Sequence, residues 1–596
     1  MLSWWDEQRG KKPLLAGALL ALVVFIVYAG ALGNGFVYDD SPQIVENPFI
    51  QNPHYWWRIF TGSVWSFQGA GAHANFYRPL QFFSYWLIYR LAGPNPAAFH
   101  LFHLLLYAAT VWLVYQVGRK LFDNEPAAFV AALLWALHPL HVEAVAWISA
   151  LPDAGFGFFY LLAFLLFLHA ETSTHKQAVG HCVAALAYFP ALLFKEMAIS
   201  FPLLLLAYWL FVAARPTGTG WRGWAARWLP YLVAVGTYLA IRKAALDHLT
   251  EARHFWKPSL RVFGASVGLL GEHLQLFLWP THLNVFHTFD LSSSLRSAWP
   301  WAALLILVGA IWIRKRQPLL GFLTIWWVVT LIPCLDIRQL SFPLLAERFS
   351  YVPSVGLCLA IAFLALLWLP QVLPGANTSR FALSGLALLM LAWGFQTARV
   401  IPTWRDNETL LNYSIQQSPD ASPLHYSRAV VLEFQHGDLE GATREYETAL
   451  RLNQASFWPT GSIIYDTYMG LGRIAYRKGR ADEAVSYFEK ALRFSPKRSD
   501  AFDALGSIYF PRGDFARAAE YFAQALKANS YDLGARFYLG TCLMKLGKYR
   551  QAAEQFRAAT DIDPEYWQAF EAEARALEAA GDAAGAAQAR NRARRR

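Results

Sequence analysis

Two adjacent carboxylates, Asp39 and Asp40, stand in the stretch GFVYDDSPQIVENPFI, just after the apolar run Leu14–Ala31. A carboxylate can act as a general base when an acceptor hydroxyl must lose its proton during attack on a substrate. An acidic pair in a loop is more often simply solvated. Here the preceding apolar run and the flanking Tyr38 and Pro42 favour a chemical role beside a membrane.

Further ionisable residues occur near the ends of other apolar runs. Ionisable side chains at membrane depth usually line a cavity or pathway, because placing them in lipid is costly. Cations and carboxylates that converge from separate loops suit a polar, anionic ligand, and Arg binds phosphate through two parallel hydrogen bonds. The residues that we expect around such a cavity are Arg78, His138, His141, Glu143, Asp153, Lys195, Glu196, Arg242, Glu347 and Arg348.

Two pairs among these residues could also serve a different purpose. His138 and His141 have the spacing that places two zinc ligands on one helix face. The intervening Pro139 distorts that turn, and no third ligand is evident nearby. We therefore expect both histidines to make structural hydrogen bonds or to line the cavity. Lys195 and Glu196, adjacent in LLFKEM, could form a simple loop ion pair.

The elements that must position these residues are membrane helices. The chain has 596 residues, of which 56% are hydrophobic and 16% charged, which is too apolar for a soluble protein of this length. Apolar runs recur through the first two-thirds, and we predict about 11 spans of bilayer length within residues 1–398. The first run is followed by Gly-Asn-Gly-Phe and not by a small-residue cleavage site, so we expect a retained helix. The candidate active-site loop, which carries the acidic pair, is expected at about 34–97.

After residue 398 the sequence becomes polar and repetitive. Equivalent glycines mark four similar segments and a degenerate fifth: Gly437, Gly479, Gly513, Gly547 and Gly581. The last four of these are each 34 residues apart, which is typical of tetratricopeptide repeats. Such helix pairs stack into a solenoid, because one pair cannot bury its apolar face alone. We predict a linker at 399–422 and about four repeats with a degenerate cap at 423–596.

The distribution of Lys and Arg predicts which side each loop faces, because cytoplasmic loops collect these residues. Basic residues within 9–12 place the N-terminus in the cytoplasm, so the acidic pair emerges outside. The segment 263–279 carries Glu272 and His273 in its middle. If it crossed the membrane, the basic cluster at 314–316 would fall outside. We therefore prefer a re-entrant or interfacial segment, which puts the repeats on the same outer face as the acidic pair.

Five stretches, in this order and followed by the repeats, resemble a known family: FVYDDSPQIVENPFI, NFYRPLQFFSYWL, HPLHVEAVAWISALPD, LLFKEMAISFP and AERFSYVPSVGL. They resemble the transmembrane and tetratricopeptide-repeat O-mannosyltransferases, within the type C membrane glycosyltransferases. The resemblance covers nearly the whole chain. It implies an all-α fold, a polytopic transmembrane helical bundle followed by a tetratricopeptide-repeat α-solenoid. The Ala- and Arg-rich composition, short repeat array and compact loops favour a bacterial member.

The resemblance also implies an activity. Such enzymes are hexosyltransferases that move a sugar, here mannose by preference, from a polyprenyl-phosphate donor to a protein hydroxyl on the extracytoplasmic face. Asp39 and Asp40 match the acidic motif of the family's first outer loop, where one of them would deprotonate or orient the acceptor. A single displacement would invert the anomeric centre. We expect Arg348, supported by Lys195 or Arg242, to hold the phosphate of the leaving lipid.

The implied partners are the lipid-linked donor, membrane lipids, and a protein or peptide acceptor bound by the repeats. Some relatives in the superfamily use a divalent cation and others do not; we expect no cofactor and no metal. The four cysteines are scattered without CxxC spacing and indicate neither disulfides nor zinc. The net charge of +10 fits basic cytoplasmic loops and does not indicate nucleic acid. The expected location is a bacterial inner membrane, with the site and repeats on the periplasmic side.

Three alternatives stay open. A non-catalytic scaffold would use its repeats to assemble an envelope complex and would tolerate loss of the acidic pair. A transporter of lipid-linked sugars would spread polar residues through the whole bilayer depth, whereas here they gather on one side. A transferase acting on a glycan or a lipid would share the same chemistry, although the repeats favour a protein acceptor. The sequence does not separate the roles of Asp39 and Asp40.

Overall fold

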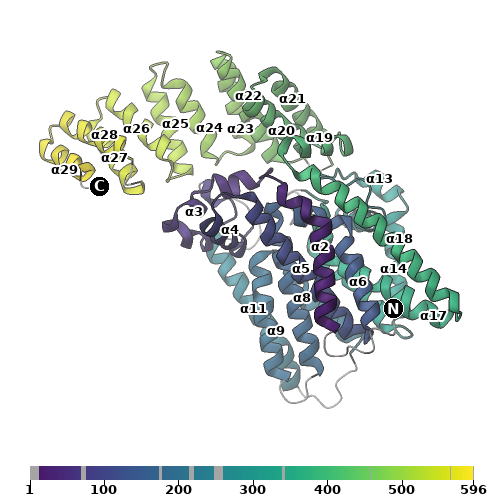
Figure 1. Cartoon of the computed structure of the whole chain (residues 1–596). Helices are drawn as coiled ribbons and strands as arrows, with labels where there is room; N and C mark the ends of the chain where they lie inside the picture. The colour runs from purple at the N-terminus through teal and green to yellow at the C-terminus, as the bar shows by residue number, and fades with distance from the viewer. Residues whose placement is uncertain are drawn as a thin grey trace. The chain divides into compact units, whose positions relative to one another are not determined.

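A computed structural model of the protein describes most of the chain. The described residues are 12–68, 76–172, 177–213, 221–246, 259–337, 343–457, 459–563 and 566–594, and every regular element within them is helical. The all-α fold expected from the sequence is therefore confirmed (Figure 1). The chain divides into two compact units, residues 1–64 with 75–420 and residues 65–74 with 421–596.

The first unit contains the apolar helices. In chain order they and their neighbours are α2 (Lys12–Tyr28), α3 (Pro48–Gln51), α4 (Pro79–Ala92), α5 (Pro96–Phe122), α6 (Glu125–Leu137), α7 (Val142–Ala146), α8 (Leu151–Thr172), α9 (Gln177–Phe194), α10 (Phe201–Phe211), α11 (Trp221–Leu246), α12 (Leu260–Leu278), α13 (Leu291–Arg296), α14 (Trp299–Ile313), α15 (Pro318–Leu335), α16 (Pro353–Phe363), α17 (Leu369–Val372), α18 (Ala376–Val400) and α19 (Asn407–Gln417). Short 3-10 or π turns join several of them, including η1 (Ala29–Gly33), η2 (Ser41–Val45), η6 (Ile148–Ala150), η7 (Glu196–Ser200), η8 (Glu347–Ser350) and η10 (Ile401–Trp404).

Many of these helices have the dimensions of membrane spans. Eight helices in the described ranges are long and apolar enough to cross a bilayer, or nine if the bent pair α6 and α7 forms one span. Pro139 lies at that break, where the axis bends by 56°. Two further apolar helices, Glu196–Phe211 and Trp299–Ile313, are shorter. The chain is thus a multi-pass membrane protein, although the expected total of about 11 spans exceeds the helices of full bilayer length.

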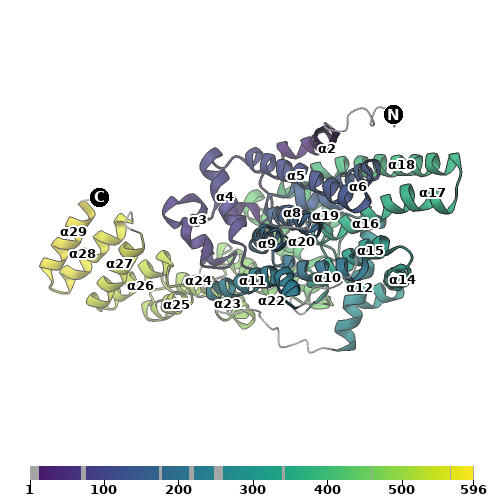
Figure 2. The ribbon, with the colours of Figure 1, turned by 90° about the horizontal axis from the view of Figure 1, so that it is seen from below.

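Helices α5, α8, α9 and α11 run side by side in Figure 1 and are seen nearly end-on in Figure 2. Two glycines of α8 let its neighbours approach closely. A Cβ on Gly155 would lie 2.5 Å from the Phe194 ring, and a Cβ on Gly157 would lie even closer to the Tyr351 ring. Any larger residue would therefore overlap these rings. The absence of a side chain brings the start of α8 against the end of α9 and against the turn at η8.

The segment between the two parts of the chain, expected as a linker at 399–422, is helical for most of its length. Helix α18 continues to Val400, and η10 and α19 follow. The α19 helix belongs to the first unit, and α20 begins at Ser422.

The second unit is a succession of helix pairs: α20 (Ser422–Val431) with α21 (Leu439–Ala455), α22 (Gly461–Arg477) with α23 (Ala481–Phe494), α24 (Ser499–Tyr509) with α25 (Phe515–Ala528), α26 (Leu533–Lys545) with α27 (Tyr549–Ile562), and α28 (Trp567–Ala579) with α29 (Ala583–Arg594). Both views show the pairs following one another (Figures 1 and 2). The five glycines identified from the sequence each lie in the turn between the two helices of a pair, with φ between +67° and +82°. Glycine adopts this left-handed conformation without steric cost, which explains its recurrence at the turn.

Candidate active site

The Asp40 carboxylate is completely buried and is held by three donors. Its Oδ1 accepts hydrogen bonds from the Ser149 backbone N–H at 2.7 Å and from the Ser149 hydroxyl at 2.6 Å. Its Oδ2 accepts the backbone N–H of Val37 at 2.9 Å. Burial raises the pKa of Asp40 to about 7, although these hydrogen bonds favour its ionised form. Asp40 therefore ties the acidic loop to η6.

The Asp39 side chain is only partly buried and makes an electrostatic contact with Arg348. Burial raises the pKa of Asp39 to about 7, and the positive charge of Arg348 limits that rise. The two neighbouring carboxylates thus occupy different environments. One is fixed by donors from the protein, and the other faces a cation.

Arg348 is positioned by a buried carboxylate. One Glu143 oxygen forms an ion pair with the Arg348 guanidinium, and the other accepts the Arg348 backbone N–H at 2.8 Å. The guanidinium carbon lies 5.2 Å from the centre of the Trp147 ring. Burial alone would lower the pKa of Arg348, but Glu143 and Asp153 raise it above its usual value. Arg348 is therefore a permanent cation beside Asp39.

Two more ion pairs belong to the same region. Lys195 Nζ lies 2.5 Å from Asp153 Oδ1, and both side chains are 3% exposed. Arg78 binds Glu196 through two hydrogen bonds, of 2.5 and 3.0 Å. The idea that Lys195 pairs with its neighbour Glu196 is therefore wrong. The extended backbone at Lys195 lets the two adjacent side chains reach different partners.

These pairs form one electrostatic cluster. Asp153 interacts with Arg78 and with Arg348 as well as with Lys195. Arg242 donates a hydrogen bond of 3.2 Å to the Tyr238 hydroxyl, and Tyr238 interacts electrostatically with Arg78. Arg242 thus lies on the Arg78 side of the cluster.

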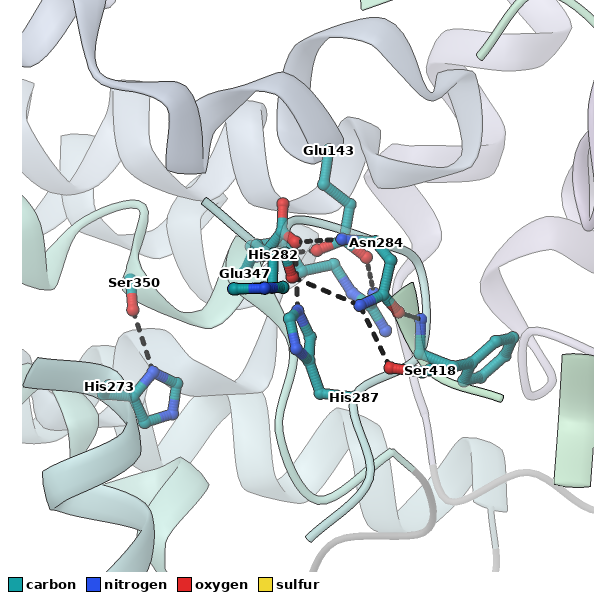
Figure 3. Close-up of polar contacts among 10 residues, drawn as sticks. Glu143, His273, His282, Asn284, His287, Glu347, Ser350 and Ser418 are labelled. Atoms are coloured by element: carbon teal, nitrogen blue, oxygen red, sulfur yellow. Dashed lines mark hydrogen bonds and ion pairs between the residues drawn. The ribbon is translucent and has the colours of Figure 1, made fainter. Parts of the chain in front are cut away.

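Glu347 contacts Asn284 and His287, in the loop that follows α12 (Figure 3). Its Oε1 accepts the Asn284 backbone N–H at 2.6 Å and lies 3.0 Å from His287 Nε2. Asn284 also donates from its side chain to the Ser418 hydroxyl at 3.3 Å. Burial raises the pKa of Glu347 above its usual range and lowers that of His287 to about 4. Glu347 therefore fastens the loop that follows α12 onto η8.

The two histidines of HPLHVE are fully buried and use all of their ring nitrogens. His138 Nδ1 accepts the Leu140 N–H at 3.2 Å, so its Nε2 carries the proton and donates to the Phe277 carbonyl at 3.1 Å. The His141 nitrogens lie 3.1 Å from the Tyr107 hydroxyl and 2.9 Å from the Ser354 hydroxyl. These contacts hold α6, α12 and α16 together and leave no nitrogen for zinc.

Comparison with known proteins gives matches over both units. Residues 73–246 match the family model of dolichyl-phosphate-mannose-protein mannosyltransferases. Residues 419–499 and 542–596 match a tetratricopeptide-repeat model, and residues 477–559 match a model of subunit 3 of the anaphase-promoting complex. A protein O-mannosyl-transferase of Caenorhabditis elegans is 25% identical over 75% of this chain and 64% of its own length. Protein O-mannosyl-transferase TMTC1 of Homo sapiens is 28% identical over 74% of this chain and 56% of its own length.

The chain is therefore similar to the TMTC-like protein O-mannosyltransferases across both units. It spans less than two-thirds of the length of these relatives. They are animal proteins, so they give no support to a bacterial origin. Among solved structures, the tetratricopeptide-repeat protein YrrB is 27% identical over 31% of this chain and 90% of its own length, with a TM-score of 0.26.

The contacts described for the acidic pair are with protein donors and with a cation. Asp40 already accepts three hydrogen bonds from the protein, and the charge beside Asp39 is that of Arg348. Within the described ranges, no three His, Cys, Asp or Glu side chains gather as ligands for a metal ion.

Several residues of the site escaped sequence reasoning. Ser149, Asn284, His287 and Asn407 are uncharged or isolated in the sequence, and each contacts the site across a long separation. Asn407, for example, contacts Tyr38, which lies 369 residues earlier. The sequence offers one signal for such residues, which is a polar residue at the end of an apolar run. Of these four residues, only Ser149 meets it, because it stands just after the HPLHVEAVAW stretch.

Proposed function

We propose that this protein transfers mannose from a polyprenyl-phosphate donor to a hydroxyl group of a protein acceptor. The acceptor oxygen forms a bond to the anomeric carbon, while the bond between that carbon and the phosphate oxygen breaks. The acceptor proton passes to a carboxylate, and the lipid phosphate leaves with the electron pair. Attack on the face opposite the leaving group inverts the anomeric centre. The family match at 73–246 and the ion-pair cluster around Asp39 support this reaction.

We assign the role of base to Asp39. A base must be able to take up a proton, and the pKa of Asp39, near 7, suits that task at neutral pH. Asp40 has a similar pKa, but its two oxygens accept three hydrogen bonds within a completely buried position. It is suited to holding the loop that presents Asp39, and not to receiving a proton from an acceptor.

Arg348 is the proposed partner of the leaving phosphate. It is 15% exposed at the side chain, lies beside Asp39, and keeps its charge because its pKa is raised by Glu143. A cation that faces the developing charge stabilises the transition state more than the ground state. Lys195 is 3% exposed and paired with Asp153, so its contribution to phosphate binding is electrostatic, through the cluster. Arg242 would support the phosphate from the Arg78 side.

The site is proposed to lie on the extracytoplasmic face. Helix α8 begins beside Asp153 and ends at Thr172, where the Thr172 hydroxyl accepts a hydrogen bond from Lys120 at 3.2 Å. At 1.5 Å per residue, Lys120 lies roughly 30 Å from the site along this helix. The basic cluster at 314–316 lies just before the start of α15. At the other end of this helix, Cys334 contacts Met197 of η7, on the side of the site. Basic residues at the far ends favour a cytoplasmic location for those ends.

The protein acceptor is proposed to bind the repeats. A pocket of about 530 Å³ lies among η11 (Leu432–His436), α22, α23 and α24, which belong to three successive pairs; it is lined by Glu433, Phe434, Arg473, Tyr476, Arg477, Phe488, Ala504, Ser507 and Ile508. Arg473 makes two hydrogen bonds to Glu433, and Arg477 lies 4.0 Å from the same carboxylate. Two cations therefore face one carboxylate. Because Phe434 and Tyr476 expose their rings beside them, the pocket suits an acidic side chain next to an apolar one.

The observation that carries the proposal is the electrostatic interaction between Asp39 and Arg348, in a chain that resembles this family. Its test uses purified protein in nanodiscs, polyprenyl-phosphate [³H]mannose, and a mixture of secretory polypeptides as acceptors. Transfer of label to protein by the wild type, lost in Asp39→Asn, is the expected result. Donor binding and turnover that are equal in wild type and Asp39→Asn would contradict the assigned base. Folded protein that binds no lipid-linked sugar would favour a scaffold instead.

A further inference from the structure

A short segment before the repeats runs beside the acidic loop. Three hydrogen bonds join the two segments, in the same order along both: from Asn34 Nδ2 to the Ile401 carbonyl at 3.3 Å, from the Gly35 N–H to the Arg405 carbonyl at 2.9 Å, and from the Tyr38 N–H to Asn407 Oδ1 at 2.7 Å. The segment 401–407 thus follows the loop almost up to the proposed base.

The last of these contacts acts on a strained residue. Tyr38 has a φ of +52°, a left-handed conformation that a bulky side chain rarely adopts. Such a conformation persists where the surroundings hold it, and it often marks a functional site. The Tyr38 ring lies against Trp147 and Phe286, at centroid distances of 5.9 and 5.6 Å. The direction in which the chain leaves Tyr38 sets the position of Asp39.

Asn407 is itself fixed in place. It is the first residue of α19, and the preceding Asp406 caps this helix by accepting the Thr409 N–H at 2.8 Å. Leu410 and Leu411, near the start of the helix, are buried inside the first unit. The carboxamide oxygen of Asn407 is therefore a rigid acceptor for the Tyr38 N–H.

The same segment reaches the other half of the proposed catalytic pair. The Trp404 ring stacks on the Trp147 ring, with 5.8 Å between centroids and 25° between planes. Trp147 in turn lies under the Arg348 guanidinium. The segment 401–407 thus contacts the residue before Asp39 and the ring beneath Arg348.

We propose that Asn407 is a positioning residue for the transfer reaction. By accepting the Tyr38 N–H it holds Tyr38 in the left-handed conformation and so aims the Asp39 carboxylate at the acceptor hydroxyl. This inference rests on the proposed function. It also assigns the segment 401–407 a part in catalysis, beyond that of joining the membrane helices to the repeats.

The test compares Asn407→Ala with Asn412→Ala, an identical change at an exposed position of the same helix. Two quantities are measured on the full chain in nanodiscs: the kinetic constants of mannose transfer, and amide hydrogen exchange of the peptide that contains Tyr38. In Asn407→Ala we expect kcat to fall about tenfold or more, with the donor KM within about twofold, because a hydrogen bond that positions the base is lost. Exchange at Tyr38 should accelerate about tenfold, since its N–H loses its acceptor.

Two further variants separate positioning from folding. Asn407→Asp keeps an acceptor oxygen and should retain kcat within about threefold. Asn412→Ala should match the wild type in both quantities. The proposal is overturned if Asn407→Ala has the kcat of Asn412→Ala, whether or not the exchange changes. If the wild type transfers no mannose, the proposed function fails together with the positioning role. Faster amide hydrogen exchange at Tyr38 in Asn407→Ala would then show only that the contact is structural.

Discussion

The two residues of the acidic pair are chemically identical but physically different. Asp40 meets three donors in a buried position, whereas Asp39 is partly exposed beside Arg348. Sequence reasoning could identify the pair, because two carboxylates after an apolar run are conspicuous. It could not separate their roles, since Ser149 approaches Asp40 from a distance of 109 residues along the chain.

The substitution Asp39→Asn removes the proposed base without changing the size of the side chain. We expect transfer to fall by about 10²–10⁴-fold, the usual contribution of a general base. Donor binding should stay close to that of the wild type, because Arg348 keeps its partner Glu143. Equilibrium binding and single-turnover transfer measure the two effects separately. A loss of donor binding without a loss of the chemical step would contradict the role assigned to Asp39.

The pH dependence follows from the pKa of Asp39, which burial raises to about 7. A base works only in its ionised form, so activity should rise with pH and level off above this value. Below it, kcat/KM should fall about tenfold for each pH unit. The measurement is a pH–rate profile between about 5.5 and 8.5, with protein stability checked at each end. A flat profile across that range would argue against Asp39 as the base.

At the scale of the elements, the sequence predicted the helices well and their contacts poorly. Apolar runs and 34-residue spacing are local patterns, so they predicted the membrane spans and the repeats. Ion pairs depend on which loops meet, and Arg348 pairs with Glu143 across 205 residues. The predicted total of about 11 spans exceeds the number of described helices that are long enough to cross a bilayer. The difference arises because α14 and the segment 196–211 are apolar but short.

The close approach of α8 to η8 gives a prediction for an element. In Gly157→Ala the new methyl group would overlap the Tyr351 ring, and relief of the overlap would displace η8, which carries Arg348. We expect a loss of about 1–3 kcal/mol in stability, as for other overpacked sites, and reduced transfer. The control is Gly309→Ala in α14, where a Cβ would meet nothing within 4 Å. Thermal unfolding in detergent should show a lower Tm for the first variant and not for the second.

At the scale of the whole molecule, the proposed function assigns the transfer reaction to the membrane domain and acceptor binding to the repeats. The charge of the repeat pocket is set by Arg473 and Arg477 against one carboxylate, Glu433. Local spacing predicted the repeats but not this pocket, because its lining comes from three successive helix pairs.

The substitution Arg477→Glu should reverse the charge of the pocket while both hydrogen bonds between Arg473 and the buried Glu433 are kept. We expect the KM for acidic polypeptide acceptors to rise about tenfold, as for the loss of a charge-assisted hydrogen bond, while transfer to a short hydroxyl-containing peptide stays constant. The matched control is Arg444→Glu, at an exposed position outside the pocket. Equal effects of the two variants would exclude this pocket as the acceptor site.

The left-handed glycine in the turn of each helix pair has a consequence for the history of this protein. Each pair contacts mainly its neighbours, and the last four glycines recur every 34 residues. Gene duplication or deletion in steps of one such unit would rejoin the same turn to the same kind of helix. The length of the array can therefore change over generations while the acidic loop and its ion pairs are inherited intact.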